Sequence, residues 1–147
     1  MLSENVRKYS ILTCEIGALY HKAAVKVGLS DTAMQVLYIV CMFENECLLS
    51  DVIRLSEISK QTVHSAVSRL EKEEFLVLKE YDKRKKLICL TEKGEKLAQD
   101  TVVQIMELEN EIMNEWTKEE QEQYIILTER YFMKFKESLI KLENRLE

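Results

Sequence analysis

Three observations predict a mainly α-helical fold with a small β element (α+β). The chain has no proline and only three glycines in 147 residues, a composition that favours helices over a β-sandwich or barrel. Apolar residues recur at every third or fourth position over long stretches, which is the helical period. Strand-like apolar runs occur at residues 75–78 and 87–90. We therefore expect one compact unit built largely of helices.

The first part of the chain predicts two helices followed by a short third one. A helix over residues 5–27 is expected to stop at Gly28, because glycine readily adopts the left-handed conformation found after helix C-termini. A serine then supplies the N-cap of a second helix over residues 31–44. Leu48–Leu55 is the short helix, and Ser56-Glu57-Ile58 is the turn that follows it.

Residues 59–72 predict a helix whose exposed face suits hydrogen bonding to nucleic acid. Ser59 can cap its N-terminus by accepting from an amide of the first turn. One face is an apolar stripe of Val63, Ala66, Val67 and Leu70. The opposite face has almost no carboxylates, and such a helix can lie in the major groove of DNA and contact base edges. Together with Ser59, the expected DNA-contacting residues are Lys60, Gln61, Thr62, His64, Ser65, Ser68, Arg69 and Lys72.

A basic hairpin follows this helix. The two strand-like runs are joined by a turn over residues 81–86, which includes the cations Lys83, Arg84, Lys85 and Lys86. A projecting tip of this kind, a wing, brings cations within reach of phosphates or the minor groove. Asp82, two residues before Arg84, is close enough to orient it. Helix, turn, helix and hairpin together predict a winged helix-turn-helix DNA-binding domain over residues 30–92.

The C-terminal part predicts two further helices and a dimer interface. Thr91 caps a long helix over residues 92–114, and Thr117-Lys118-Glu119-Glu120 is a capping box for a last helix that runs to about residue 145. That helix carries a near-heptad apolar seam, which needs a packing partner. We expect a homodimer built from both ends of the chain, residues 1–29 and 93–147, with packing inside one chain as the alternative. The expected contacts are Val6, Tyr9, Ile16, Tyr124, Tyr131, Phe135, Leu139, Leu142 and Leu146.

Charge is distributed unevenly along the chain. Residues 60–86 contain eight lysines and arginines against five acidic residues, a local charge of +3, although the whole chain has a net charge of −5. Residues 107–123 carry seven glutamates and one lysine. A basic face on an acidic body is typical of a protein that docks on double-stranded DNA by one side. Ordinary solvated surface charge is the alternative.

Three motifs occur together in the winged region. They are Ser59-Lys60-Gln61-Thr62-Val63, Asp82-Lys83-Arg84, and Leu90-Thr91-Glu92-Lys93-Gly94. In order and spacing they resemble the recognition helix and the D-x-R…LT-x-x-G signature of the MarR family of bacterial transcription regulators. The chain departs from the family pattern at Glu57 and Glu74, near which family members usually have glycine. The resemblance implies a homodimer that binds an inverted-repeat operator, as a ligand-responsive repressor.

The same resemblance implies an effector site between the dimerisation helices and the DNA-binding block. Tyr9, Tyr20, Met34 and Tyr38 offer aromatic, polarisable and hydroxyl groups near that junction, and core packing is the alternative for each of them. The expected effector is a small aromatic or apolar molecule that changes the spacing of the two recognition helices.

Other chemistries have little support in the sequence. His21 and His64 have no evident nucleophile partner and no H-x-x-x-H spacing, and the sequence has no glycine-rich phosphate loop. We therefore expect no enzyme, no cofactor and no structural metal. The longest apolar run, Val36 to Phe43, is too short to span a bilayer, and we expect a cytoplasmic protein without a membrane partner.

Two alternative functions stay open. Cys14 lies in the predicted first helix, as does the reactive cysteine of peroxide-sensing relatives, so thiol-based redox sensing is one alternative. Its position sixteen residues before Ser30 favours an incidental thiol. Cys41 and Cys89 are expected to be reduced and buried. The other alternative is a helical protein-interaction module that does not bind DNA.

Overall fold

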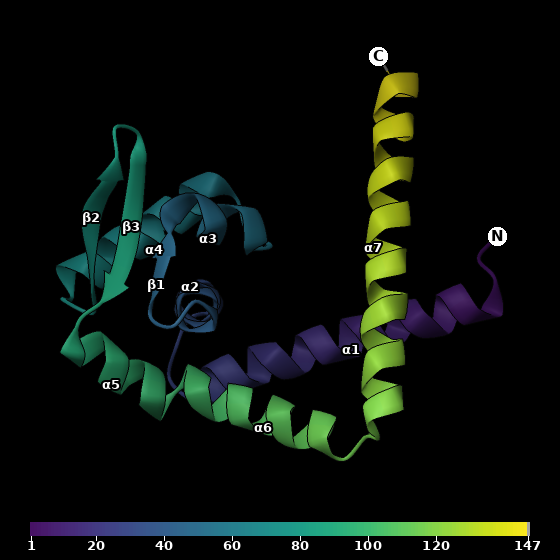
Figure 1. Ribbon diagram of the computed structural model, residues 1–147, viewed down its shortest axis with the longest axis horizontal. Coiled ribbons are helices and arrows are strands. Elements are labelled where there is room, and N and C mark those ends of the chain that lie inside the picture. Colours follow the sequence, from purple (N-terminus) through teal and green to yellow (C-terminus); the bar gives the residue numbers. More distant parts are fainter. Residues whose placement is uncertain (147) are drawn as a thin grey trace. The chain divides into compact units, whose positions relative to one another are not determined.

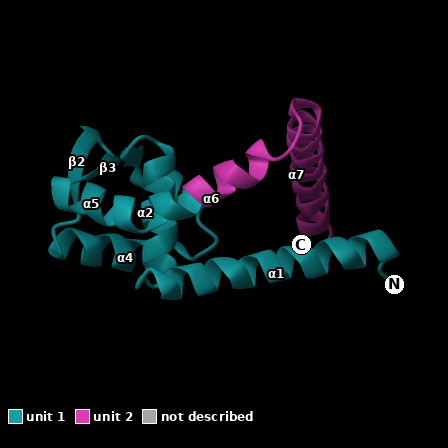
Figure 2. Ribbon diagram, turned by 90° about the horizontal axis from the view of Figure 1, so that it is seen from below, with its two compact units in different colours: residues 1–106 teal, residues 107–147 magenta. Residues whose placement is uncertain are grey.

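The computed structural model describes residues 1–146 and has the predicted mainly helical fold with a small antiparallel sheet (Figure 1). Its elements divide between two units, residues 1–106 and residues 107–147 (Figure 2). In chain order they are α1 (Glu4–Lys26), α2 (Asp31–Met42), β1 (Glu46–Leu48), α3 (Leu49–Leu55), α4 (Lys60–Lys72), β2 (Leu76–Asp82), β3 (Lys85–Leu90), α5 (Glu92–Asp100), α6 (Val102–Asn114) and α7 (Lys118–Leu146).

The sheet has the strand order β1-β3-β2, and both pairings are antiparallel. Ile88 of β3 lies opposite Cys47 of β1 on one side and Leu78 of β2 on the other. The strand β1 was not predicted from the sequence, because three residues are too few to show an alternating pattern. This short strand nevertheless places Cys47 in the core, where its side chain is 3% exposed.

The hydrophobic core lies in the first unit, where α2, α3 and α4 pack with the sheet and the start of α6. Its largest fully buried side chains come from all of these elements. They are Leu37, Leu76, Ile88, Val36, Val40, Val52, Val63, Val67 and Val102. The helix-turn-helix formed by α3 and α4 is therefore held by the same core that holds the base of the β2–β3 hairpin.

Three helices end in one backbone motif, in which the residue after the cap is left-handed and two amides bond back to helix carbonyls. Gly28 has this role after α1 with φ 76°, which confirms the predicted stop. Glu44 after α2 and Glu74 after α4 have φ 57° and 61°. The predicted end of the second helix at residue 44 is thus wrong, because Glu44 reverses the chain. The outer bonds of the motif join the amides of Leu29, Asn45 and Phe75 to the carbonyls of Ala24, Val40 and Leu70.

The prediction of one long helix over residues 92–114 is also wrong, because the chain bends at Thr101 between α5 and α6. Thr101 has φ −132° and ψ −90°, outside the helical region. Its Oγ1 donates to the carbonyl oxygen of Leu97 at 2.6 Å, a local bond that competes with the helical ladder. Ala98 and Val102, on either side of this bend, both lie in the core and are at most 2% exposed.

The second unit consists of the end of α6 and the helix α7. The predicted capping box is present: Thr117 Oγ1 accepts from the Glu120 amide at 3.1 Å, and Glu120 Oε2 accepts from the Thr117 amide at 2.8 Å. None of the described residues of α7 is buried. Within residues 1–146 no single helix has the length and apolar character needed to cross a membrane, although the bent pair α1–α2 passes that test jointly.

Candidate nucleic-acid interface and effector cavity

Helix α4 presents the polar face that the sequence predicted. Ser59 Oγ accepts from the Thr62 amide at 3.2 Å, which confirms the N-cap. Val63, Val67 and Leu70 are buried against the core. All eight predicted contact residues of this helix, from Lys60 to Lys72, are exposed. Anchoring of the apolar stripe thus fixes which side of α4 is available to a double helix.

One cation of this face already has a partner inside the chain. Arg69 Nε lies 3.1 Å from Glu73 Oε1, one helical turn further on, and both side chains are exposed. An exposed pair of this kind contributes roughly 0.3–0.5 kcal/mol. Glu73 can therefore hold the guanidinium in place and release it to a phosphate at little cost.

The wing is a tighter hairpin than the sequence predicted. Its strands continue to Asp82 and from Lys85, so the tip is Lys83-Arg84 and not a six-residue turn. A bulge between Glu80 and Asp82 strengthens the twist near the tip. The predicted turn was too long because both faces of the strands are exposed near the tip, so the apolar alternation that marks a strand is absent there. The backbone pairing nevertheless continues to Asp82 and Lys85.

Pairing in the hairpin separates the four wing cations into two groups. Lys86 lies opposite Glu80 and Lys85 lies opposite Asp82, so acidic partners face both strand lysines. Lys83 and Arg84 occupy the tip itself. Asp82 Oδ1 accepts from the Lys83 amide at 2.6 Å, and so it orders the backbone of the turn. Whether it also orients the Arg84 side chain stays a prediction.

A junction between residues 73–75 and residues 91–94 connects the end of α4 to the segment that follows β3. Thr91 Oγ1 donates to the Glu74 carbonyl at 2.6 Å, and the Thr91 amide donates to the Phe75 carbonyl at 3.1 Å. The same Thr91 Oγ1 accepts from the Gly94 amide and so caps α5. One threonine thus fixes α4, the hairpin and α5 relative to one another.

Two further residues of the Leu90–Gly94 motif complete this junction. Lys93 Nζ donates to the Glu73 carbonyl at 2.7 Å and lies 4.6 Å from the centre of the Phe75 ring, so it neutralises the negative end of α4. A Cβ on Gly94 would lie 1.7 Å from the Phe75 carbonyl oxygen. The glycine of this motif therefore has a structural role, because only a residue without a Cβ lets α5 lie this close to the Phe75 backbone.

Three of the four thiols are held in their protonated form. Burial raises the pKa of Cys41 to about 11 and that of Cys47 to about 12, and burial is also the main cause of a raised pKa at Cys89. Cys89 is buried as predicted, whereas Cys41 is only half-buried. Cys14 is exposed on α1. Within residues 1–146 no three His, Cys, Asp or Glu side chains are grouped to hold a metal.

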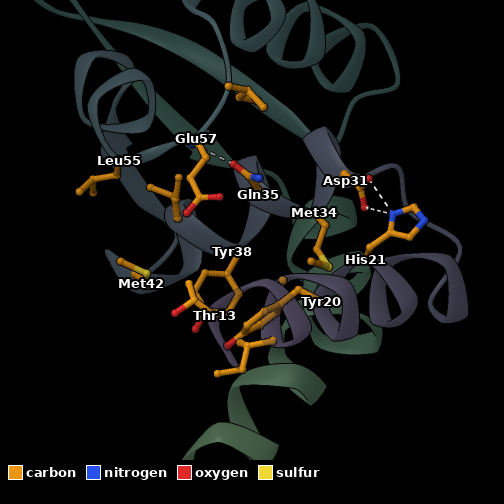
Figure 3. A pocket seen from close by; sticks show the side chains of 14 residues that line it. Thr13, Tyr20, His21, Asp31, Met34, Gln35, Tyr38, Met42, Leu55 and Glu57 are labelled. Atoms are coloured by element: carbon orange, nitrogen blue, oxygen red, sulfur yellow. Dashed lines mark hydrogen bonds and ion pairs between the residues drawn. The ribbon is translucent and has the colours of Figure 1, made fainter. Parts of the chain in front are cut away.

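A cavity of about 720 Å³ lies in the first unit between α1, α2 and the turn that leads into α4 (Figure 3). Tyr20, Met34 and Tyr38, three of the four predicted effector residues, line it. Tyr9 is not among the lining residues, because the cavity begins one helical turn later, at Thr13. Most of the wall was not predicted from the sequence: Thr13, Ile16, Gly17, His21, Asp31, Gln35, Ile39, Met42, Leu55, Glu57 and Ile58. Their three- and four-residue spacing on α1 and α2 was the available signal.

The cavity is connected to the helix-turn-helix by one hydrogen bond. The Glu57 amide, in the turn between α3 and α4, donates to Gln35 Oε1 of α2 at 3.2 Å. On the other side of the cavity, His21 Nδ1 lies 2.8 Å from Asp31 Oδ2. Because a carboxylate only accepts, Nδ1 carries the hydrogen of this pair. The cavity wall thus reaches to within two residues of the N-cap Ser59.

The nine residues predicted to form a dimer interface are all exposed within the chain, with exposed fractions from 44% for Leu139 to 79% for Leu146. On α7 the apolar residues line up at helical spacing, and Tyr131 stacks on Phe135 with ring centres 6.1 Å apart. Exposed apolar surface of this extent is typical of an interaction face.

The architecture agrees with that of solved regulators. A MarR family regulator from Neisseria meningitidis is 18% identical, with a TM-score of 0.76 over 95% of this chain and 98% of that chain. NadR in complex with 4-hydroxyphenylacetate is 16% identical, with a TM-score of 0.69 over 89% and 93%. MepR from S. aureus in complex with DNA is 17% identical, with a TM-score of 0.65 over 92% and 99%. These similarities show the fold.

Sequence comparison agrees with the structural one. No curated protein matches the chain at a significant level. The model of the MarR family matches residues 27–85, which extend from the end of α1 through the helix-turn-helix to the wing tip. Regulators of this family are DNA-binding proteins and not enzymes. Residues 27–85 are therefore similar to the MarR family, and the described chain has the winged-helix fold of these regulators.

Proposed function

We propose that the chain is a ligand-responsive repressor that binds an inverted-repeat operator as a homodimer. The observation that carries the DNA-binding part is the carboxylate-poor, exposed face of α4 beside a wing tip of Lys83 and Arg84. A helix of this kind reads base edges in the major groove, and a cationic tip contacts phosphates or the minor groove. MepR, which has the same fold, was solved in complex with DNA.

The homodimer is supported by the apolar faces of α1 and α7. Exposed tyrosine and aliphatic side chains form rows on both helices, and α7 adds phenylalanines. No described residue of α7 is buried, so its apolar seam has no packing partner inside the chain. A second copy of the chain offers the same faces, as a two-fold interface requires. Two copies related in this way would present two α4 helices, from which we expect a preference for an inverted repeat with half-sites about one helical turn apart.

The ligand response is supported by the cavity beside the helix-turn-helix. Its volume of about 720 Å³ falls in the range of small-molecule sites, roughly 300–1,000 Å³. Tyrosine, methionine and isoleucine side chains form much of its wall. NadR, with the same fold, was solved with a small aromatic ligand, 4-hydroxyphenylacetate. A ligand that prefers one spacing of the two α4 helices changes operator affinity by its differential affinity for the two states.

The DNA contacts are tested by selecting duplexes from a random pool and measuring affinity against salt concentration. Arg84→Ala should weaken binding to most sequences and reduce the salt slope by roughly one unit for each phosphate that the protein no longer neutralises. Lys118→Ala removes one positive charge outside the proposed interface and serves as the control. If Arg84→Ala has the affinity and salt slope of the unmodified protein, the wing tip does not contact DNA.

Base reading is tested separately from phosphate binding. Alanine at Gln61, Ser65 and Ser68 should relax the selected sequence, at about 1–3 kcal/mol for each well-made base contact. The salt slope should stay close to that of the unmodified protein, because these side chains are neutral. A triple variant that selects the same duplexes would exclude this face of α4.

The dimer is tested with charges placed in the seam of α7. Phe135→Glu combined with Leu142→Glu should give monomers in sedimentation equilibrium, because burying two unpaired carboxylates is costly. Arg130→Glu, on a different face of α7, is the control for added negative charge. Binding to the inverted repeat should fall in the double variant and not in the control. A double variant that stays dimeric would place the interface elsewhere.

A further inference from the structure

The charges on the cavity wall are unusual for a site that takes an acid. Within the described chain, no lysine or arginine is among the residues that line the cavity. Two carboxylates, Asp31 and Glu57, do line it, together with His21. The two carboxylates give the wall two negative charges. A positive charge on His21 would offset one of them and leave a net charge of −1. A ligand carboxylate would therefore meet a negative field and no fixed cation to pair with.

The remaining wall suits a positively charged aromatic molecule. Tyr20 and Tyr38 offer ring faces that attract a cation, and Met34 and Met42 offer polarisable thioethers that pack against an aromatic body. Figure 3 shows Glu57 and the His21–Asp31 pair on opposite sides of Met34, so acidic groups flank the apolar centre.

We propose that the cavity selects an aromatic molecule that carries one ammonium group, in preference to a neutral or acidic analogue of the same shape. This inference rests on the proposed ligand response and names the chemical class of the ligand. Glu57 transmits the binding event, because it lines the cavity and precedes the N-cap Ser59 by two residues. An ammonium that draws the Glu57 carboxylate toward the cavity acts on the turn that Gln35 holds through the Glu57 amide.

The test uses three probes with the same aromatic body and different charge: tyramine, the neutral alcohol tyrosol, and 4-hydroxyphenylacetate. Their affinities for the full-length protein without DNA are measured by NMR chemical-shift titration. We expect tyramine to bind about fivefold more tightly than 4-hydroxyphenylacetate, with tyrosol between them, since both carboxylates are exposed and screened. A modest ratio is therefore the expected one.

Variants connect this preference to the cavity. Glu57→Gln and Asp31→Asn should each reduce the ratio of tyramine to 4-hydroxyphenylacetate affinity, to about twofold. Glu95→Gln, which removes an exposed carboxylate of α5 outside the cavity, should leave it unchanged. In the DNA-binding assay, tyramine should weaken operator binding of the unmodified protein and have less effect on Glu57→Gln.

The outcomes separate this inference from the proposed function. Equal or tighter binding of 4-hydroxyphenylacetate, no binding of any of the three probes, or a preference that survives both cavity variants would overturn the inference. None of these results depends on DNA. A protein that selects no duplex would refute the proposed function instead, and the charge preference of the free protein would still be measured.

Discussion

Replacement of Gly94 by alanine should destabilise the fold through a clash at the junction between α5 and the end of α4. An alanine Cβ would lie 1.7 Å from the Phe75 carbonyl oxygen and 2.8 Å from its carbonyl carbon. Both atoms belong to the backbone, so no side-chain rotation can relieve the clash. Either α5 or the segment around Phe75 has to move by about 2 Å to reach an ordinary van der Waals distance.

The size of the effect follows from the hydrogen bonds that cross this junction. Moving α5 away breaks the bonds from Thr91 Oγ1 to the Glu74 carbonyl, from the Thr91 amide to the Phe75 carbonyl, and from Lys93 Nζ to the Glu73 carbonyl. At about 1 kcal/mol each, breaking them costs about 3 kcal/mol. The better helix propensity of alanine offsets about 1 kcal/mol of this. The free energy of unfolding should therefore fall by about 2 kcal/mol.

Gly17→Ala is the matched control, because it makes the same chemical change inside a helix. A Cβ on Gly17 meets nothing within 4 Å, so this variant should gain up to about 1 kcal/mol. Guanidinium unfolding followed by far-UV circular dichroism, at one protein concentration, gives both values. A Gly94→Ala protein that is as stable as the unmodified one, or two variants that shift in the same direction, would refute the steric argument.

Two further predictions concern Glu74 and Cys47. Glu74→Gly should raise the free energy of unfolding by about 1 kcal/mol, because it relieves a left-handed residue with φ 61°; the same change at the exposed helical Glu71 should lower it by a similar amount. Equal effects at the two sites would contradict this. Burial raises the pKa of the Cys47 thiol from 9.0 to about 12, so the thiol loses its proton more readily in the unfolded chain. The contribution of this thiol to stability should therefore be constant below pH 9.0 and should fall as the pH rises toward 12. The test is to measure the free energy of unfolding at several pH values below and above 9.0. Above pH 9.0 it should fall less steeply with pH for Cys47→Ala than for the unmodified protein.

The exposed polar face of α4 and the hairpin could be predicted in detail because their signals are local. The Ser59 cap and the apolar stripe from Val63 to Leu70 act within one helix, and together they fix which face of α4 is exposed. The hairpin was predicted for the same reason, since its strands are close in sequence. Its six-residue turn was wrong because the register of β2 and β3 depends on backbone pairing across the hairpin, down to Asp82 and Lys85.

The wall of the cavity was predicted only in part. Tyr20, Met34 and Tyr38, which line it, were expected near the junction because they recur at helical spacing. Glu57 was not, because it lies in a different element and reaches the cavity only through the packing of α1, α2 and the helix-turn-helix turn. The acidic character of the wall depends on Asp31 and Glu57 together, which are far apart in sequence, so no local pattern could indicate it.

The sequence by itself determined where helices begin, since caps such as Ser59 and Thr117 act on the amides of their own first turn. It also determined the basic segment at residues 60–86. Only the tertiary structure decided where α2 ends, which backbone follows α4, and where the chain bends between α5 and α6. Glu44 and Glu74 adopt a conformation that favours glycine, and Thr101 interrupts a regular helical pattern. At Glu44 and Glu74 the packing of buried neighbours outweighs a local preference of about 1–2 kcal/mol. Those neighbours are distant in sequence, so the residue type alone does not indicate this conformation.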